Sequence, residues 1–376
     1  MPWDDSISLH DQRRAFLSLV AEGPCSFHCA CGRFAISRKT GYKWLRRAEV
    51  PRPQPPLDRS RRPAHSPGRI SDPFERRILH LRDSYRWGAR KIRSLLCREG
   101  LVSSTRTVHR VLRRHGRVAP AGPRCGPHRF ERPLPNDLWQ MDFKGPLLVE
   151  GRPRYLLSIE DDHSRYALAC RLCPDQTMAS VWPVLWEVFG HAGLPRQILT
   201  DNGFAPRGPS NGGLSWLEGR LARLGIESPH GRPYHPQTRG KVERWHGTLE
   251  QELLPGLDHG DEERLAAQRE QWRVEVYNPL RPHEALGNDV PASRWYASER
   301  RRPVELPALS YPSGMETRQV MQKGEISWKG YESLVGAGLY GERVGVQEQG
   351  GELILLYATR EVRRYRIAEL RKGRVQ

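Results

Sequence analysis

Three acidic residues stand in local contexts that could support chemistry on a phosphodiester. They are Asp142 in the segment LWQMDF, Asp201 in LTDNG and Glu243 in GKVER. Because dozens of residues separate them, only a folded domain can bring them together. Converging carboxylates repel each other unless a cation lies between them, and Mg²⁺ prefers carboxylate, water and phosphate oxygens. The three residues therefore predict a metal-dependent site that attacks a phosphodiester.

The composition favours a polyanionic partner. The chain has 376 residues, with 61 lysines and arginines against 43 acidic residues, a net charge of +18 and a pI near 10.0. Such a charge could also be a solubility feature, but here it is rich in arginine, whose planar fork suits phosphate. The length predicts about three domains. We expect no contact with a membrane and a cytoplasmic, nucleoid-associated location, because no run of apolar residues is long enough to span a bilayer and the amino end is acidic.

Three of the seven cysteines and one histidine crowd together near the amino end without forming a recognisable zinc motif. Cys25, His28, Cys29 and Cys31 lie within one short segment, but no second ligand pair follows at the usual spacing. We do not expect zinc there, and the alternative is a short helix with small apolar side chains. Free thiols are the default for the cysteines in a reducing compartment.

The sequence predicts a helix-turn-helix domain over residues 1–50. Helices are expected over residues 9–20 and 26–34, and Ser37 is placed as the N-cap of a basic helix anchored by Trp44. That last helix would enter the major groove of DNA. Its expected DNA-binding residues are Arg38, Lys39, Thr40 and Lys43. The alternative is a generic three-helix bundle with a solvated basic face.

A Pro- and Arg-rich linker, residues 51–71, leads to a second helix-turn-helix candidate, residues 72–118. Asp72 is expected as the N-cap and Pro73 as the first-turn proline of its first helix, and Thr105 is expected to cap its third. Four arginines would face outward from that third helix, and the expected DNA-binding residues are Arg106, Arg110 and Arg113, with Arg114 beside them. Two modules in tandem can read a longer site than one. Residues 119–135 form another linker.

From residue 136 to 298 the pattern becomes α/β. Strands are expected over residues 138–143, 154–160, 166–172 and 196–200, with helices over 176–189, 214–224 and around Glu243. Asp201 follows a strand directly, and ligands in α/β domains gather at strand ends. Asp161 and Asp162 are weaker candidates for the metal because they follow the second strand in a turn. His246 is expected to be exposed, although it could support a metal-bound water.

The carboxyl-terminal part reads as a linker, residues 299–312, followed by a small β-barrel, residues 313–376. Alternating segments flank Lys329-Gly330 and Gly350-Gly351, which signal hairpins. Five arginines near the end suggest contact with DNA or a partner, against the alternative of a solubilising charge. They are Arg360, Arg363, Arg364, Arg366 and Arg371.

The motifs together resemble the DDE-type bacterial insertion-sequence transposases and the retroviral integrase superfamily. The resemblance rests on WQMD, TDNG, YHPQTRGKVER and RPHEALG; it covers about residues 10–300 and weakens in the linkers. It implies a ribonuclease H-like catalytic core, with Asp142, Asp201 and Glu243 as its catalytic and metal-binding triad. It also implies Mg²⁺ or Mn²⁺, two ions per active site. The spacing between Asp201 and Glu243 is somewhat longer than is typical, and the Gly- and Pro-rich insert at 205–213 accounts for this.

The expected function is therefore that of a DNA transposase, whose partners are double-stranded DNA at the element's terminal inverted repeats and at the target. Four residues of the loop and helix before Glu243 are expected to handle the DNA end, namely Tyr234, Gln237, Arg239 and Lys241. A homo-oligomer, dimer or tetramer, is expected because two ends must be joined. Two alternatives stay open: a catalytically silent DNA-binding regulator and a structure-specific nuclease of the same fold.

Overall fold

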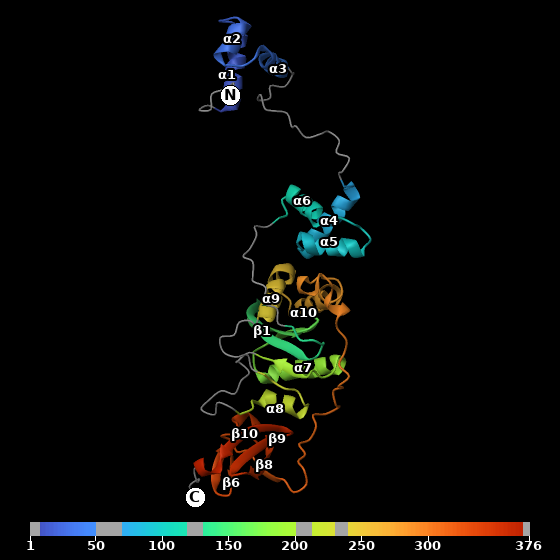
Figure 1. The fold of residues 1–376 in the computed structure, drawn as a ribbon, viewed down its shortest axis with the longest axis vertical. Helices are drawn as coiled ribbons and strands as arrows, with labels where there is room; N and C mark the ends of the chain where they lie inside the picture. The colour runs from blue at the N-terminus through green and yellow to red at the C-terminus, as the bar shows by residue number, and fades with distance from the viewer. Residues whose placement is uncertain (1–7, 50–69, 119–130, 201–212, 230–239, 371–376) are drawn as a thin grey trace. The chain divides into compact units, whose positions relative to one another are not determined.

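The computed structural model describes residues 8–49, 70–118, 131–200, 213–229 and 240–370. The chain divides into two compact units, Met1–Ile70 and Ser71–Gln376 (Figure 1). In the described parts of both units, no helix is long and apolar enough to cross a membrane.

The N-terminal unit is a three-helix domain, as expected. Its helices are α1 (Leu9–Glu22), α2 (Phe27–Arg33) and α3 (Arg38–Ala48). Ser37 caps α3 by accepting a 3.2 Å hydrogen bond from the Thr40 amide, which confirms the predicted N-cap. Trp44 is fully buried against Phe16 and Ile36 and so anchors α3 in the domain.

A second helical module opens the larger unit, with α4 (Asp72–Tyr85), α5 (Ala89–Arg98) and α6 (Thr105–Arg114). Two predicted caps are wrong by one position, since the caps are Ser71 and Ser104 and not Asp72 and Thr105. The Ser104 hydroxyl accepts from the Thr107 amide at 3.1 Å, so the preceding serine is the cap of α6.

The central sheet has the strand order β3-β2-β1-β4. Its strands are β1 (Leu138–Val149), β2 (Arg152–Asp161), β3 (Ala167–Cys173) and β4 (Gln197–Leu199). The β1-β2-β3 strands are antiparallel, whereas β4 runs parallel to β1, and a parallel bridge from Gln197 to Glu227 extends the sheet beyond β4. β1 is longer than predicted because it continues past Gly145 and Pro146 through a register shift.

Helices cover both faces of this sheet, with α9 and α10 on one side and α7 on the other (Figure 1). One face packs against α7 (Met178–Ala192) and α8 (Trp216–Arg223). The other face packs against α9, η3 and η5 through Trp245, Leu249 and Tyr277. The elements of that side are α9 (Gly240–Thr248), the π-helical turn η3 (Leu249–Leu253), the 3₁₀ turn η4 (Leu254–Gly256), α10 (Glu262–Gln271) and the π-helical turn η5 (Trp272–Tyr277).

The C-terminal region forms two open sheets, and the predicted closed barrel is not confirmed. One sheet has the order β10-β9-β8-β5, and a separate hairpin pairs β6 with β7, as the Lys329-Gly330 signal predicted. The apolar side chains are covered by packing between the sheets and against α8, so no closure is needed to bury them. The elements are β5 (Glu316–Gln319), β6 (Glu325–Trp328), β7 (Tyr331–Leu334), η8 (Ala337–Leu339), β8 (Arg343–Gln349), β9 (Glu352–Tyr357) and β10 (Arg360–Arg366).

The C-terminal sheets share a hydrophobic cluster with α8 of the core. Leu214 and Ala222 pack with Leu339 and Tyr357 in this cluster. Glycine permits the close backbone approach, because a Cβ built on Gly338 would lie 2.5 Å from the Leu214 carbonyl oxygen. The expected linker 299–312 is also attached to the core, since the Arg300 guanidinium donates to the carbonyls of Pro195, Leu224 and Gly225.

Candidate active site

Asp142 lies on β1, the strand between β2 and β4, and its carboxylate faces α9. One oxygen, Oδ1, accepts a 2.9 Å hydrogen bond from the Phe143 amide, and Oδ2 lies 3.9 Å from Nδ1 of His246. The side chain is 33% exposed, so solvent and a ligand can reach it. Carboxylate oxygens at a partly exposed position fit the hard-donor preference of Mg²⁺.

His246 is not the exposed side chain that the sequence predicted. Its side chain is 13% exposed, and burial together with the Lys144 charge lowers the pKa of the imidazole to about 4. A neutral imidazole therefore faces Asp142 at neutral pH, while its Nε2 has no hydrogen-bond partner among the described residues. The sequence feature that could have predicted the place of His246 near the site is its position three residues after Glu243. Residues three apart lie on one face of a helix.

The other two members of the expected triad are described only in part. Glu243 belongs to α9, but its side chain lies outside the described atoms, and Asp201 lies outside the described residues altogether. The pairing of β1 with β4 is described up to Gln140 and Leu199, each two positions before an expected ligand. In the part of the chain that is described, no group of three or more His, Cys, Asp or Glu side chains could hold a metal ion.

Asp162 anchors the start of α9 to the sheet. Its Oδ1 accepts hydrogen bonds from Gln140 Nε2 at 2.6 Å and from Lys241 Nζ at 2.5 Å, and its Oδ2 accepts from the Arg132 amide. Burial lowers the pKa of Lys241, whose side chain is 11% exposed. The ammonium that was expected to contact DNA is thus engaged inside the core, where it fixes the helix that carries Glu243.

Neighbouring acids on β2 are also structural. Asp161 is buried and accepts from the Asn136 amide and from both the amide and the hydroxyl of Ser164. Glu160 accepts from the Tyr277 hydroxyl at 3.3 Å, and burial raises its pKa to about 7. These contacts occupy Asp161 and Asp162 as hydrogen-bond acceptors, in agreement with their lower rank as metal ligands.

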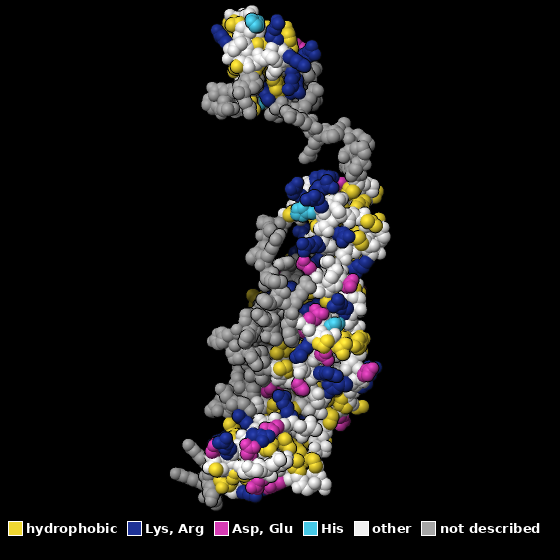
Figure 2. Space-filling model, in the orientation of Figure 1, with side chains coloured by type: hydrophobic (Ala, Val, Ile, Leu, Met, Phe, Trp, Pro, Cys, Tyr) yellow, Lys and Arg dark blue, Asp and Glu magenta, His cyan; other side chains and the backbone are white. Residues whose placement is uncertain are grey.

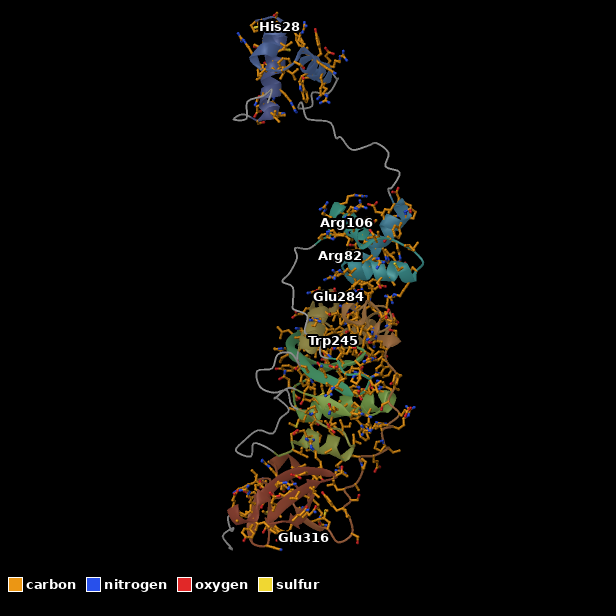
Figure 3. All side chains as sticks on the ribbon, viewed as in Figure 1. His28, Arg82, Arg106, Trp245, Glu284 and Glu316 are labelled. Atoms are coloured by element: carbon orange, nitrogen blue, oxygen red, sulfur yellow. The ribbon has the colours of Figure 1, made fainter. Side chains whose placement is uncertain are left out.

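The expected DNA-reading helices carry exposed basic side chains. Arg38, Lys39 and Lys43 are exposed on α3, whereas Thr40 is half-buried against the Ser37 hydroxyl. On α6, Arg106, Arg110 and Arg113 are exposed, as is Arg114. Figure 2 shows basic side chains gathered over the second helical module, and Figure 3 shows Arg106 on it.

Several other expected contacts have a different or undescribed placement. Arg114 is exposed on α6, as expected, but its guanidinium is also paired within the module, donating to both carboxylate oxygens of Glu75 at 3.0 Å. On β10, Arg364 pairs with Glu352 and Glu361, so part of the C-terminal basic stripe is neutralised internally. Four expected residues lie outside the described part of the chain: Tyr234, Gln237, Arg239 and Arg371.

Comparison with known proteins assigns the two main regions. Models described as integrase core domain match residues 132–236 and 224–291, and a model described as homeodomain-like domain matches residues 40–112. The uncharacterized 39.2 kDa protein of insertion element IS476 of Xanthomonas euvesicatoria is 26% identical over 293 residues, 75% of each chain. The putative transposase of insertion sequence element IS5376 of Geobacillus stearothermophilus is 26% identical over 247 residues, 62% of this chain and 60% of its own length.

The integrase-core matches and these insertion-element relatives together support a DDE-type insertion-sequence transposase. As a transposase of the integrase-core type, it is an enzyme of the polynucleotidyl transferase kind, with a homeodomain-like helix-turn-helix region before the catalytic core. A simian T-cell lymphotropic virus intasome structure aligns over 80% of this chain and 99% of its own chain, at 16% identity and a TM-score of 0.37.

Proposed function

We propose that this transposase binds the ends of a mobile element, hydrolyses a phosphodiester there to free a 3′-hydroxyl, and joins that hydroxyl to target DNA. The observation that carries the proposal is the approach of α9 to Asp142. His246 reaches Asp142 from α9, and Glu243 lies three residues earlier on the same helix. Residues three apart share one side of a helix, which supports Glu243 facing the same carboxylate.

The parallel pairing of β1 with β4 supports Asp201 as the third member. If the register Gln140 to Leu199 continues by two positions, Asp142 and Asp201 become partners on neighbouring strands. Asp142, Asp201 and Glu243 would then hold two Mg²⁺ or Mn²⁺ ions. When bound, such ions supply stabilisation of charge on the attacking and leaving oxygens of an in-line displacement.

The chain's own residues would position this site and the DNA. Lys241 and Trp245 hold α9 against the sheet, one through Asp162 and one within the apolar cluster below the helix. The exposed basic residues of α3 and α6 would bind the element end, with phosphate contacts fixing the register and base contacts specifying sequence. Because two ends must be joined, we expect the protein to act as a dimer or tetramer on DNA.

A strand-transfer assay with a labelled element end tests the proposal. With Mg²⁺ or Mn²⁺ the wild type should yield joined product. Cut product alone would instead indicate a nuclease, and neither product would indicate a DNA-binding regulator. Ca²⁺ should permit binding with little chemistry, because its coordination geometry is looser.

Glu243→Gln should reduce both end hydrolysis and strand transfer by about 10³-fold or more, while DNA binding survives. The amide keeps the size of the side chain but removes the charge that would hold a hard cation. Glu250→Gln is the matched control, since Glu250 is exposed and paired with Lys144 further along the same helical stretch. Near-normal strand transfer by Glu243→Gln would show that the triad is wrongly assigned.

A further inference from the structure

The buried carboxylate of Glu252 lies at the centre of the contact between the second helical module and the catalytic core. Its side chain is 6% exposed. Oε2 accepts from Trp87 Nε1 at 3.0 Å and from Arg281 Nε at 2.7 Å, while Oε1 accepts from Lys91 Nζ at 2.6 Å and from Arg281 Nη2 at 2.9 Å. Two of the three donor residues belong to the module, so this acid joins the module to the core.

The surroundings of Glu252 favour its ionised form. Burial acts to raise the pKa of Glu252, but hydrogen bonds and charges from Arg281 and Lys91 outweigh it and keep the pKa below the ordinary value. Breaking a buried pair by removing one partner leaves an uncompensated charge, which is far more costly than losing an exposed pair. The contact is therefore expected to persist while the chain is folded.

Further contacts extend this docking surface along one side of α5. The Ser94 hydroxyl donates to the Asn288 carbonyl at 3.1 Å, and the Arg98 guanidinium donates to the Leu280 carbonyl at 3.0 Å. Arg90 pairs with Glu284, which lies where the core meets the module (Figure 3). Residues 91, 94 and 98 follow the spacing of one helical stripe of α5, and Trp87 lies just before the helix, so α5 uses this stripe for the core and not for DNA.

The core side of the contact belongs to the helical stretch that carries Glu243. Glu252 lies on η3, which follows α9 without interruption. A π-helical turn redirects the side chains that follow it and often marks a functional position. The module is thus fastened to the same continuous element that approaches Asp142, while α6, with its exposed arginines, lies on the far side of α5 from the core (Figure 1).

We infer that the contact of Trp87 and Lys91 with Glu252 is a positioning device that sets the distance along DNA between the sequence read by α6 and the phosphodiester cut by the core. The inference rests on the proposed function, because it presumes that α6 reads the element end. A rigid attachment allows one separation between the read and the cut positions. A flexible tether would allow several.

The experiment maps the cut position on a labelled element end at single-nucleotide resolution, with the full chain. In the double variant Trp87→Phe with Lys91→Met, cuts should spread over neighbouring phosphodiesters, and the rate at the wild-type position should fall about 100-fold. Affinity for the element end should not change, since the α6 arginines are untouched. Lys91→Arg keeps a donor and should cut at the wild-type position. Lys91→Met alone is the fallback if the double variant does not fold.

Arg93→Met is the matched control. It removes one exposed charge from the same helix, and Arg93 donates to the Ser103 carbonyl within the module. This variant should keep a single cut position at the wild-type rate. A spread as wide as that of the double variant would mean that any loss of charge on α5 disturbs the cut, and would overturn the assignment to Glu252.

Amide hydrogen exchange over residues 86–98 provides a readout that does not need activity. The double variant should exchange at least about tenfold faster than the wild type there, because undocking exposes α5 to local opening. Faster exchange with an unchanged cut position would overturn the positioning role, and unchanged exchange together with an unchanged cut would overturn the contact itself. If the wild type neither cuts nor joins, the proposed function fails, while exchange still reports whether Glu252 docks the module.

Discussion

At the scale of single residues, the buried environment of Glu160 gives its carboxyl group a raised pKa, close to neutral pH. The group lies on the same face of the sheet as Asp142, because it pairs with Gln140 and side chains alternate along a strand. Burial raises its pKa to about 7, even though the charges of Arg165 and Lys241 act in the opposite direction. A buried acid with this pKa should make the stability of the fold depend on pH.

The sign of this pH dependence follows from comparing the folded with the unfolded chain. Below about pH 4.5 the Glu160 carboxyl is protonated in both states, so folding does not change its protonation. As pH rises toward 7 the unfolded chain ionises first, and the folded state progressively loses stability. Glu160→Gln mimics the neutral form, so its free energy of unfolding should exceed that of the wild type by about 3 kcal/mol at pH 8 and by much less near pH 5.

Urea unfolding at both pH values measures this difference. Glu263→Gln, at an exposed position of α10, is the control and should show no such change with pH. If the advantage of Glu160→Gln were the same at pH 5 and pH 8, the raised pKa of Glu160 would be refuted.

The buried environments of His246 and Glu160 could not be predicted from the sequence, because their burial depends on helices that pack from distant parts of the chain.

At the scale of elements, local patterns predicted most helices and strands. Ser37 and the Lys329-Gly330 turn act through near neighbours in the sequence, so their roles could be predicted directly. The caps of α4 and α6 were misplaced by one residue, since each true cap is a serine directly before the residue that was chosen. Whether the C-terminal strands close into a barrel, and where α5 packs, depends on contacts between distant parts of the chain. The spacing of residues in the sequence does not predict such contacts.

The DNA-reading role of α6 can be tested at this scale. Arg110→Ala should weaken binding to the element end and reduce the slope of log affinity against log salt by about one. The variant loses one phosphate contact, so fewer counterions are released when the DNA binds. Arg114→Ala is the matched control on the same helix. The Arg114 guanidinium is paired with Glu75, so Arg114→Ala should lower the free energy of unfolding and leave the salt slope nearly unchanged. Equal slopes for Arg110→Ala and wild type would argue against α6 as a phosphate-contacting helix.

At the scale of the larger unit, the C-terminal sheets are attached to the core by close glycine contacts. A Cβ at Gly338 would lie 2.5 Å from the Leu214 carbonyl oxygen and from the Ser215 backbone. Gly338→Ala should therefore lower stability by about 1–3 kcal/mol, the usual cost of overpacking. Scanning calorimetry should show a lower unfolding midpoint than for Gly256→Ala, whose new methyl group would meet nothing within 4 Å. Equal midpoints would show that the two regions are only loosely joined.

The eight residues of α8 serve two hydrophobic clusters at once. Leu217 and Leu221 pack into the central core, while Ala222, with Leu214 just before the helix, packs beneath the C-terminal sheets. A catalytic fragment cut off near residue 300 would leave that second face bare to water, and bare apolar patches promote aggregation. Exchanging C-terminal regions between related transposases should thus succeed only when the outer face of α8 is transplanted with them.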